Sequence, residues 1–157
     1  MKVRPLIAAI LLFAWLGAPI SAARLEDPRT GKVEKVAPGA AALHLVFFAT
    51  WCPDCVEELD ELRDLQARWA DRGYELVIVA VRNRQTADRL AEFVGENRPP
   101  GRLLYDVKGE AASEWKADRL PTHVVLDAGG AEAARSSELD GSIEQALRSL
   151  LGGSRRR

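Results

Sequence analysis

The sequence predicts an α/β fold in which a central mixed β-sheet carries helices on both faces. Three apolar runs of strand length, at 43–48, 74–81 and 122–126, lack helical spacing and are typical of strands buried on both faces. Helical patterns lie between them, and Asp-Ala-Gly-Gly at 127–130 predicts a hairpin. Because strands and helices alternate along the chain, we expect one layered domain.

The other elements follow from the spacing of apolar residues between these strands. After a polar extension, we expect an edge strand at 30–36, a helix from 56 to about 73, a helix at 85–95, a loop at 97–101, a strand at 103–105, a helix at 109–115, an edge strand at 132–136 and a helix at 142–151. In the first helix, apolar residues recur at steps of three and four, and Gly73 ends it. Asp140 or Gly141 is expected to cap the last helix. Trp69 and Trp115 are expected to face the core.

The first 23 residues have the pattern of a secretory signal peptide. A positive segment with Lys2 and Arg4 precedes the apolar run 6–16, and Ser21 to Ala23 offers a cleavage site. The run is shorter than the roughly 20 residues that span a bilayer, so cleavage is favoured over retention as a membrane anchor. We therefore expect an exported, periplasmic protein.

Removal of this segment leaves room for one domain at 24–151, followed by a flexible basic tail at 152–157. The full chain of 157 residues has 22 Lys and Arg against 23 Asp and Glu, without a basic stripe that alternates with aromatic residues. This pattern predicts no nucleic-acid partner. Nothing in it indicates an obligate oligomer, so we expect a monomer.

Most of the functional information lies in the two cysteines, Cys52 and Cys55, at the junction of a strand and a helix. A single pair excludes both a scaffold of several disulfides and a four-cysteine zinc site within one chain. A bridge over two residues closes a small loop and stabilises a fold poorly, so an exported pair with this spacing is expected to be redox-active.

The position of the pair also predicts how the two thiols differ. A helix N-terminus carries unpaired N–H groups and partial positive charge, which stabilise a thiolate and lower its pKa. Pro53 suits the first helical position and biases Cys52 away from helical backbone angles. We therefore expect Cys52 to be an exposed N-cap thiol, and the less exposed Cys55 to attack a mixed disulfide formed on Cys52.

These motifs resemble the thioredoxin superfamily, and within it the exported TlpA/ResA-like thiol-disulfide oxidoreductases. The matching residues are Ala49-Thr50-Trp51-Cys52 with Cys55 after a buried strand, Glu58 three residues later, and Leu120-Pro121-Thr122 before another strand. The resemblance covers about residues 31–151 and implies a thioredoxin fold. It also implies a cis peptide bond at Pro121 beside the cysteines.

The resemblance implies roles for individual residues. Cys52, Cys55 and Glu58 would be catalytic, with Glu58 helping to move the proton of Cys55. The residues implied in client binding are Trp51, Pro53, Leu120, Pro121 and Thr122. No cofactor or metal is implied. The implied partners are client proteins with disulfides, among them apocytochromes awaiting haem and oxidised metallochaperones, and a membrane thiol donor of the DsbD/CcdA type.

Departures from the family pattern carry further expectations. Thioredoxin itself has a buried acidic residue where this chain has Val46, so the proton acceptor for Cys55 must come from elsewhere. Asp54 places negative charge near Cys52 and disfavours its thiolate, which predicts a reductant rather than an oxidant. The Gly-x-Pro-Glu sequence of the CcmG group is absent around Pro121, which weakens a specific role in cytochrome maturation.

Other interpretations of the same residues stay open. Glu58 could be an ordinary solvated helix carboxylate, and His123 could be either a packed sheet residue or a substrate contact. His44 is expected to be structural. The competing function is a non-catalytic module that binds copper through its thiols or docks a partner protein. Copper-handling proteins of this fold space their cysteines by three residues rather than two, so disulfide reduction is favoured.

Overall fold

The computed structural model describes residues 23–37 and 39–153. The predicted signal peptide, apart from Ala23, and residues 154–157 of the predicted basic tail lie outside this range. Within it, no helix is long and apolar enough to cross a membrane.

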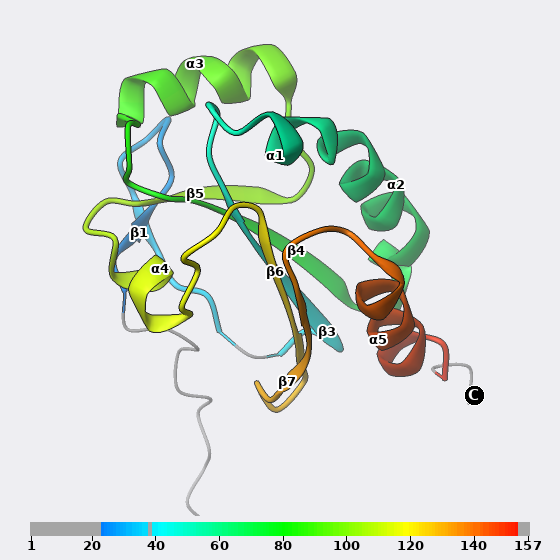
Figure 1. Ribbon diagram of the computed structural model, residues 1–157. Coiled ribbons are helices and arrows are strands. Elements are labelled where there is room, and N and C mark those ends of the chain that lie inside the picture. The colour runs from blue at the N-terminus through cyan, green and yellow to red at the C-terminus, as the bar shows by residue number, and fades with distance from the viewer. Residues whose placement is uncertain (1–22, 38, 154–157) are drawn as a thin grey trace, which may run out of the picture.

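The centre of the fold is a mixed β-sheet (Figure 1). Its strands are β1 (Leu25–Glu26), β2 (Val33–Glu34), β3 (Ala42–Phe48), β4 (Tyr74–Ala80), β5 (Arg102–Asp106), β6 (Thr122–Asp127) and β7 (Glu132–Ser136). Among the described residues the order is β2-β1-β5-β4-β3-β6-β7. β3 runs parallel to β4 and antiparallel to β6, which makes the sheet mixed. The predicted fold class is therefore confirmed.

The helices connect these strands. They are α1 (Pro53–Glu57), α2 (Leu59–Trp69), the 3-10 turn η1 (Ala70–Arg72), α3 (Ala87–Asn97), α4 (Glu110–Glu114) and α5 (Gly141–Leu151). α5 begins after Asp140, whose side chain accepts hydrogen bonds from the N–H groups of Ser142 and Ile143, so the predicted cap is confirmed. β7 also spans the predicted residues.

Two elements differ from the sequence prediction. The expected extension before residue 30 contains β1, which pairs with β5 some eighty residues along the chain. The helix expected from 56 to 73 begins earlier, at Pro53, and is interrupted at Glu58. It ends as expected at Gly73, whose φ of 83° lies in the left-handed region and whose added Cβ would lie 3.0 Å from the Ala41 Cβ.

The two faces of the sheet are covered by different elements. Side chains alternate along β3, so His44, Val46 and Phe48 share one face and Leu45 and Phe47 share the other. α2, α3 and α5 cover the first face; the ring of Phe48, for example, lies 5.4 Å from that of Phe93 in α3.

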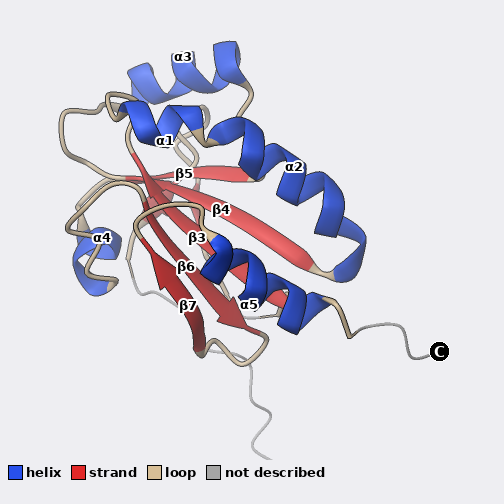
Figure 2. Ribbon diagram, turned by 45° about the vertical axis from the view of Figure 1, so that its right-hand side comes forward, coloured by secondary structure: helices blue, strands red, loops and turns tan. Residues whose placement is uncertain are grey.

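The opposite face is covered by α4 and the N-terminal segment, whose residues line a small apolar cavity together with Leu45 and Phe47. Figure 2 shows α2 and α5 across one face of the sheet and α4 apart from them. Trp69 and Trp115 are partly buried and pack against the core, as predicted.

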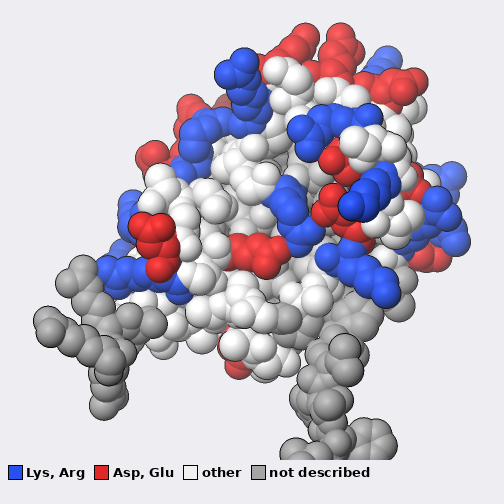
Figure 3. All heavy atoms as spheres, turned by 180° about the vertical axis from the view of Figure 1, so that it is seen from behind, with Lys and Arg blue, Asp and Glu red and all other residues white. Residues whose placement is uncertain are grey.

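The surface carries charges of both signs. Figure 3 shows Lys and Arg interspersed with Asp and Glu on the face seen from behind, without a continuous stripe of one sign. Several of these charges form ion pairs, such as Arg102 with Glu34 at 2.8 Å.

Candidate functional site

Cys52 and Cys55 form a disulfide at the start of α1, directly after the carboxyl end of β3. Their Cα atoms lie 5.3 Å apart. Cys52 is the N-cap, with an extended backbone (φ −96°, ψ 108°), and its Sγ accepts a hydrogen bond from the Cys55 N–H at 3.3 Å. Pro53 follows in the first helical turn, where its missing N–H costs nothing. The local geometry predicted for this pair is therefore confirmed.

The exposure predicted for Cys52 is wrong in this oxidised state. Cys52 is only 5% exposed and Cys55 2%, so both are buried and differ little. Cys52 lies at the wall of a groove that Trp51 and Leu120 also line. Trp51, by contrast, is 41% exposed.

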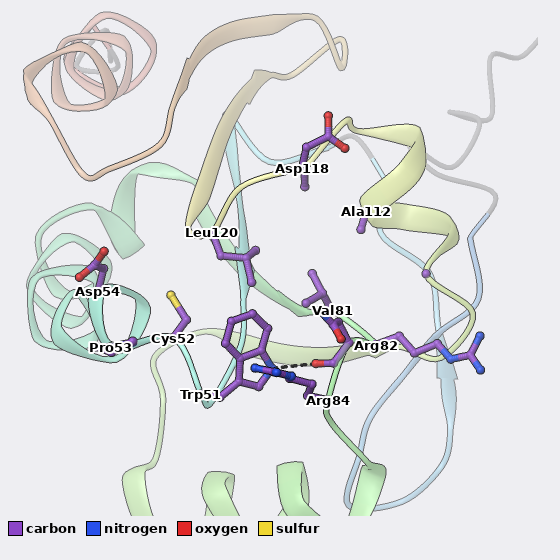
Figure 4. A pocket seen from close by; sticks show the side chains of 13 residues that line it. Trp51, Cys52, Pro53, Asp54, Val81, Arg82, Arg84, Ala112, Asp118 and Leu120 are labelled. Atoms are coloured by element: carbon purple, nitrogen blue, oxygen red, sulfur yellow. Dashed lines mark hydrogen bonds between the residues drawn. The ribbon is translucent and has the colours of Figure 1, made fainter.

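A groove with a volume of about 820 Å³ lies beside Cys52. Its lining comes from three parts of the chain: Trp51, Cys52, Pro53 and Asp54; Val81, Arg82, Asn83 and Arg84; and Gly109, Ala112, Ala117, Asp118 and Leu120. Figure 4 shows the Cys52 sulfur near Leu120, with the Trp51 ring beside it and Val81 and Arg82 beyond. An extended client segment laid in this groove would bring its disulfide next to Cys52.

Trp51 joins the cysteine loop to the segment after β4. Its indole Nε1–H donates to the carbonyl oxygen of Asn83 at 2.7 Å, shown by the dashed line in Figure 4. The guanidinium of Arg84 lies 5.9 Å from the ring centroid, within the range of a cation–π contact. The ring is therefore held in place while it still presents surface to the groove.

The buried side chain of Gln85 supports the loop that carries the cysteines. The Gln85 side-chain oxygen accepts from the Thr50 N–H at 2.8 Å, and its amide nitrogen donates to the Val81 carbonyl oxygen. The Tyr105 hydroxyl in turn donates to the Gln85 carbonyl oxygen at 3.0 Å. Gln85 thus connects the residues just before the cysteines to the end of β4.

A second cavity, of about 390 Å³, lies on the other side of Leu120. It is lined by Asp54, Glu57, Glu58, Glu61, Arg119, Leu120, Pro121, Ser137 and Glu138. The peptide bond between Leu120 and Pro121 is cis, as the resemblance implied.

Glu58 is not a solvated helix carboxylate. Its side chain is 16% exposed, and both oxygens have partners. Oε1 accepts from the Leu139 N–H and Oε2 contacts His123 Nε2, each at 2.8 Å. Glu58 sits at the break between α1 and α2, one turn after Cys55.

His123 begins a chain of buried polar side chains behind Glu58. Its Nδ1 lies 3.1 Å from His44 Nε2, and His44 Nδ1 lies 2.8 Å from the Tyr74 hydroxyl. Burial lowers the pKa of His44 well below its ordinary value, with a smaller effect from His123 in the same direction. Burial also raises the pKa of Tyr74.

The sequence-predicted residues occupy different parts of this site. Trp51, Pro53 and Leu120 line the groove with Cys52, whereas Pro121 lines the second cavity with Glu58. Thr122 lines neither; it is buried at the start of β6, where its hydroxyl donates to the Arg119 carbonyl oxygen at 2.6 Å. His123 is fully buried, so the packed interpretation is confirmed and direct substrate contact is excluded in this state.

Sequence reasoning missed two sets of residues. One is the groove wall formed by Arg82, Asn83 and Arg84, although a polar segment after a parallel strand often lines a ligand crevice. The other is the pairing of His44 with His123. Two buried histidines on separate strands were visible, but only the strand register brings them together.

Most of the chain matches a family model, and about half of it is similar to named thiol-disulfide oxidoreductases. The model of the Redoxin family matches residues 16–147. The thiol-disulfide oxidoreductase ResA of Oceanobacillus iheyensis is 28% identical over 86 residues, which cover 55% of this chain and 44% of that protein. The sporulation thiol-disulfide oxidoreductase A of Bacillus subtilis is 28% identical over 87 residues, which cover 55% of this chain and 53% of that protein. The chain thus spans about half the length of these relatives.

The fold is similar to solved structures over a larger part of the chain. The crystal structure of StoA from Bacillus subtilis superimposes with a TM-score of 0.66 at 20% identity, covering 84% of this chain and 99% of that one. This likeness shows a thioredoxin-like fold. Because the family model covers most of the residues that build the sheet and the cysteine pair, the chain belongs to the Redoxin family.

Proposed function

We propose that this protein is an exported thiol-disulfide oxidoreductase that reduces disulfides of client proteins. The observation that carries the proposal is the Cys52–Cys55 disulfide at the wall of an open groove. A structural bridge needs no groove beside it, whereas an exchange reaction needs room for a client chain to approach one sulfur. Relatives named as thiol-disulfide oxidoreductases support the same reaction.

The reaction proceeds in two thiol–disulfide exchanges, and its electrons and protons balance. The Cys52 thiolate attacks one sulfur of the client disulfide, forming a mixed disulfide and releasing the client's other sulfur as a thiolate. Cys55 then loses its proton, attacks the Cys52 sulfur and releases the second client thiolate. The two cysteines lose two electrons, the client gains them, and the client thiolates take up two protons.

Continued turnover needs a thiol donor that reduces the Cys52–Cys55 disulfide again. The resemblance implies a membrane donor of the DsbD/CcdA type in the exported compartment. Clients in such a compartment include apocytochromes, whose cysteines must be reduced before haem attachment. The groove has apolar walls around Trp51 and Leu120, and flanking charges of both signs, which suit extended segments of varied sequence.

The direction of electron flow depends on the stability of the Cys52 thiolate. α1 has only five residues, and Asp54 lies exposed in its first turn at the edge of both cavities. Its negative charge opposes the partial positive charge of the helix end, which favours a reductant. Because Asp54 is exposed, solvent and salt screen part of this effect.

The first experiment is the reduction potential of the Cys52–Cys55 couple in dithiothreitol buffers. A potential near that of thioredoxin, about −270 mV, is expected for a reductant, whereas a value near about −120 mV would make the protein an oxidant. Asp54→Asn should lower the pKa of the Cys52 thiol and make the couple more oxidising. An unchanged potential in this variant would remove the argument from Asp54.

Client reduction is tested with insulin as the probe. The wild-type protein should reduce insulin with dithiothreitol as donor, and Cys52→Ser should abolish the reaction. Cys55→Ser should instead trap a mixed disulfide on Cys52. The exchange mechanism would be contradicted if Cys55→Ser trapped no mixed disulfide and both variants still reduced insulin.

The competing copper-binding function is measured on the same reduced protein. In the described part of the chain, no group of three or more His, Cys, Asp or Glu side chains is placed to hold a metal ion. Copper would therefore rest on the two thiolates. Tight stoichiometric Cu(I) binding combined with negligible insulin reduction would favour that function over disulfide reduction.

A further inference from the structure

We propose that His123, His44 and Tyr74 are positioning residues that hold Glu58 as the proton acceptor for Cys55. The three side chains form one hydrogen-bonded chain behind the carboxylate, on the sheet face that α2 and α5 cover. This inference rests on the proposed exchange reaction, and it adds to that reaction a defined group of residues behind the acceptor.

The strand register explains why the three side chains meet. Val46 on β3 pairs with His123 on β6, so His44, two residues earlier on β3, is a diagonal neighbour of His123 on the same face. Ala42 pairs with Tyr74 on β4, so His44 and Tyr74 are diagonal neighbours as well. The resulting contacts are 2.8 Å from Glu58 to His123, 3.1 Å from His123 to His44 and 2.8 Å from His44 to Tyr74.

The donors and acceptors of this chain permit one consistent direction when both histidines are neutral. A carboxylate only accepts, so His123 must carry its proton on Nε2 and leave Nδ1 as an acceptor. His44 must then donate from Nε2 and accept at Nδ1, and the Tyr74 hydroxyl must donate to that Nδ1. The Glu58 carboxylate thereby selects the tautomer of His123, His123 selects that of His44, and the Tyr74 hydroxyl donates to the remaining acceptor of the chain.

Burial favours the neutral forms of His44 and Tyr74. His44 and His123 are fully buried and Tyr74 is 5% exposed. Burial lowers the pKa of His44 and raises that of Tyr74, which keeps both groups uncharged at neutral pH.

The charged groups that face Glu58 lie on several elements. Besides His123 on β6, they are Asp54, Glu57 and Glu61 on α1 and α2, Arg119 before β6, and Glu138 before α5. Four of these five are acidic. The N–H groups of His123 and Leu139 donate directly to the two Glu58 oxygens.

The proton balance of the second exchange gives this arrangement its function. Cys55 is 2% exposed, so its proton needs an acceptor within the protein. Glu58 follows it by one turn, and each carboxylate oxygen keeps a free lone pair after accepting its N–H donor. The proton moves from the Cys55 sulfur to Glu58, the Cys55 thiolate forms the bond to the Cys52 sulfur, and the second client sulfur leaves with the electron pair.

A purely structural role explains these residues poorly. Several direct neighbours of the histidines on this sheet face are apolar, among them Leu76, Ile78 and Val125. Apolar side chains at His44 and His123 would fill the same space without the cost of burying polar groups. The polar chain is therefore expected to contribute to the reaction more than to stability.

The first test reads the tautomers directly from the ring nitrogen signals of both histidines by NMR on the oxidised protein at neutral pH. We expect protonated Nε2 and unprotonated Nδ1 on His44 and His123. Tyr74→Phe removes the hydroxyl that donates to His44, and we expect the Nδ1 signal of His44 to shift while both rings keep their tautomers. The opposite tautomer in the wild type, or an unchanged His44 Nδ1 signal in the variant, would overturn the proposal. This test needs no client.

The second test separates the two exchanges with dithiobis(nitrobenzoate) as the probe. Reduced protein releases one coloured thiolate when Cys52 attacks and a second when Cys55 resolves the adduct. For His123→Leu we expect the rate of the first release to stay within about twofold of the wild-type rate. The second release should slow about tenfold, which is less than the effect of losing the proton acceptor altogether. The acidic limb of the second release should move to higher pH, since the carboxylate loses an N–H donor.

Tyr74→Phe should cause a smaller change in the same direction, and it serves where His123→Leu does not fold. Ile78→Val is the control, because it changes packing on the same buried sheet face without removing a member of the chain, and its pH profile should equal that of the wild type. An unchanged second release, or slowing without a shift of the pH profile, would overturn the proposal even if insulin is reduced. If the second release slows and its pH profile shifts but the wild-type protein does not reduce insulin, the proposed function is contradicted and the role of the three side chains is not.

Discussion

The loop that carries the cysteines depends on one buried amide, and its replacement gives a stability prediction that can be worked from the structure. Gln85→Leu keeps a side chain of similar size but removes two hydrogen bonds. The Thr50 N–H loses its acceptor at 2.8 Å, and the Val81 carbonyl loses a donor. Gln85 is only 7% exposed, so water does not readily replace it.

The expected loss follows from these two groups. A buried polar group left without a partner costs about 1–3 kcal/mol. Val81 is buried and Thr50 is half-buried, so Thr50 can recover part of its loss from water. We therefore expect the free energy of unfolding to fall by about 2–4 kcal/mol. For a domain of this size, each kcal/mol corresponds to about 3 °C in Tm.

The assay is urea unfolding of the oxidised protein, with the wild type and both variants measured under the same conditions. Asn83→Ala is the matched control, because this exposed side chain lies in the same loop while its backbone carbonyl still accepts from Trp51. The control should stay within about 0.5 kcal/mol of the wild type. A loss below about 0.5 kcal/mol in Gln85→Leu would refute the claim that Gln85 supports the loop.

Three further predictions concern the groove, a helix cap and two glycines. Trp51→Phe removes the indole hydrogen bond of 2.7 Å but keeps a ring, so insulin reduction should slow about two- to tenfold while reduction of the protein by dithiothreitol stays unchanged; an equal loss in both reactions would contradict a role in client docking. The pKa of Asp140 is lowered to about 2, chiefly by serine hydroxyls, so its charged form contributes stability above pH 4 that is lost as the pH falls towards 2. Asp140→Asn keeps a capping oxygen, and its urea midpoint should fall less than that of the wild type between pH 5 and pH 2; parallel curves would show that another group is responsible. Gly101→Ala should cost about 2–4 kcal/mol in urea unfolding, because φ is 68° and the new Cβ would lie 2.4 Å from the Leu76 carbonyl oxygen. Gly95→Ala, inside α3 with nothing within 4 Å, should instead stabilise by about 0.5–1 kcal/mol, and a loss there would contradict the helix assignment.

The sequence alone was sufficient for the fold class and for the position of the cysteine pair. Apolar runs such as 74–81 and the helical spacing after Cys55 depend on residues close together in the chain, so local pattern predicts them. The same holds for Cys52 as N-cap before Pro53, since capping is decided within one turn.

Local pattern was insufficient where distant segments meet. β1 has two residues, too few to show a period, and it forms only because β5 offers an edge. The groove wall at Arg82 and Arg84 becomes a wall because the segment after β4 lies beside Trp51. The wall beside Cys52 also depends on the fold, since Leu120 comes to the same groove from a remote segment.

The residues around Glu58 show most clearly what the sequence determined and what the tertiary structure determined. From the sequence, Glu58 was a carboxylate one turn after Cys55, and His44 and His123 were separate residues on two strands. The tertiary structure joined them, because the register of β3 with β6 places the histidines diagonally on one face and the break between α1 and α2 brings Glu58 over it. Residue type and local spacing determine which chemistry is available, whereas strand register, which depends on pairing across the whole sheet, determines which groups can act together.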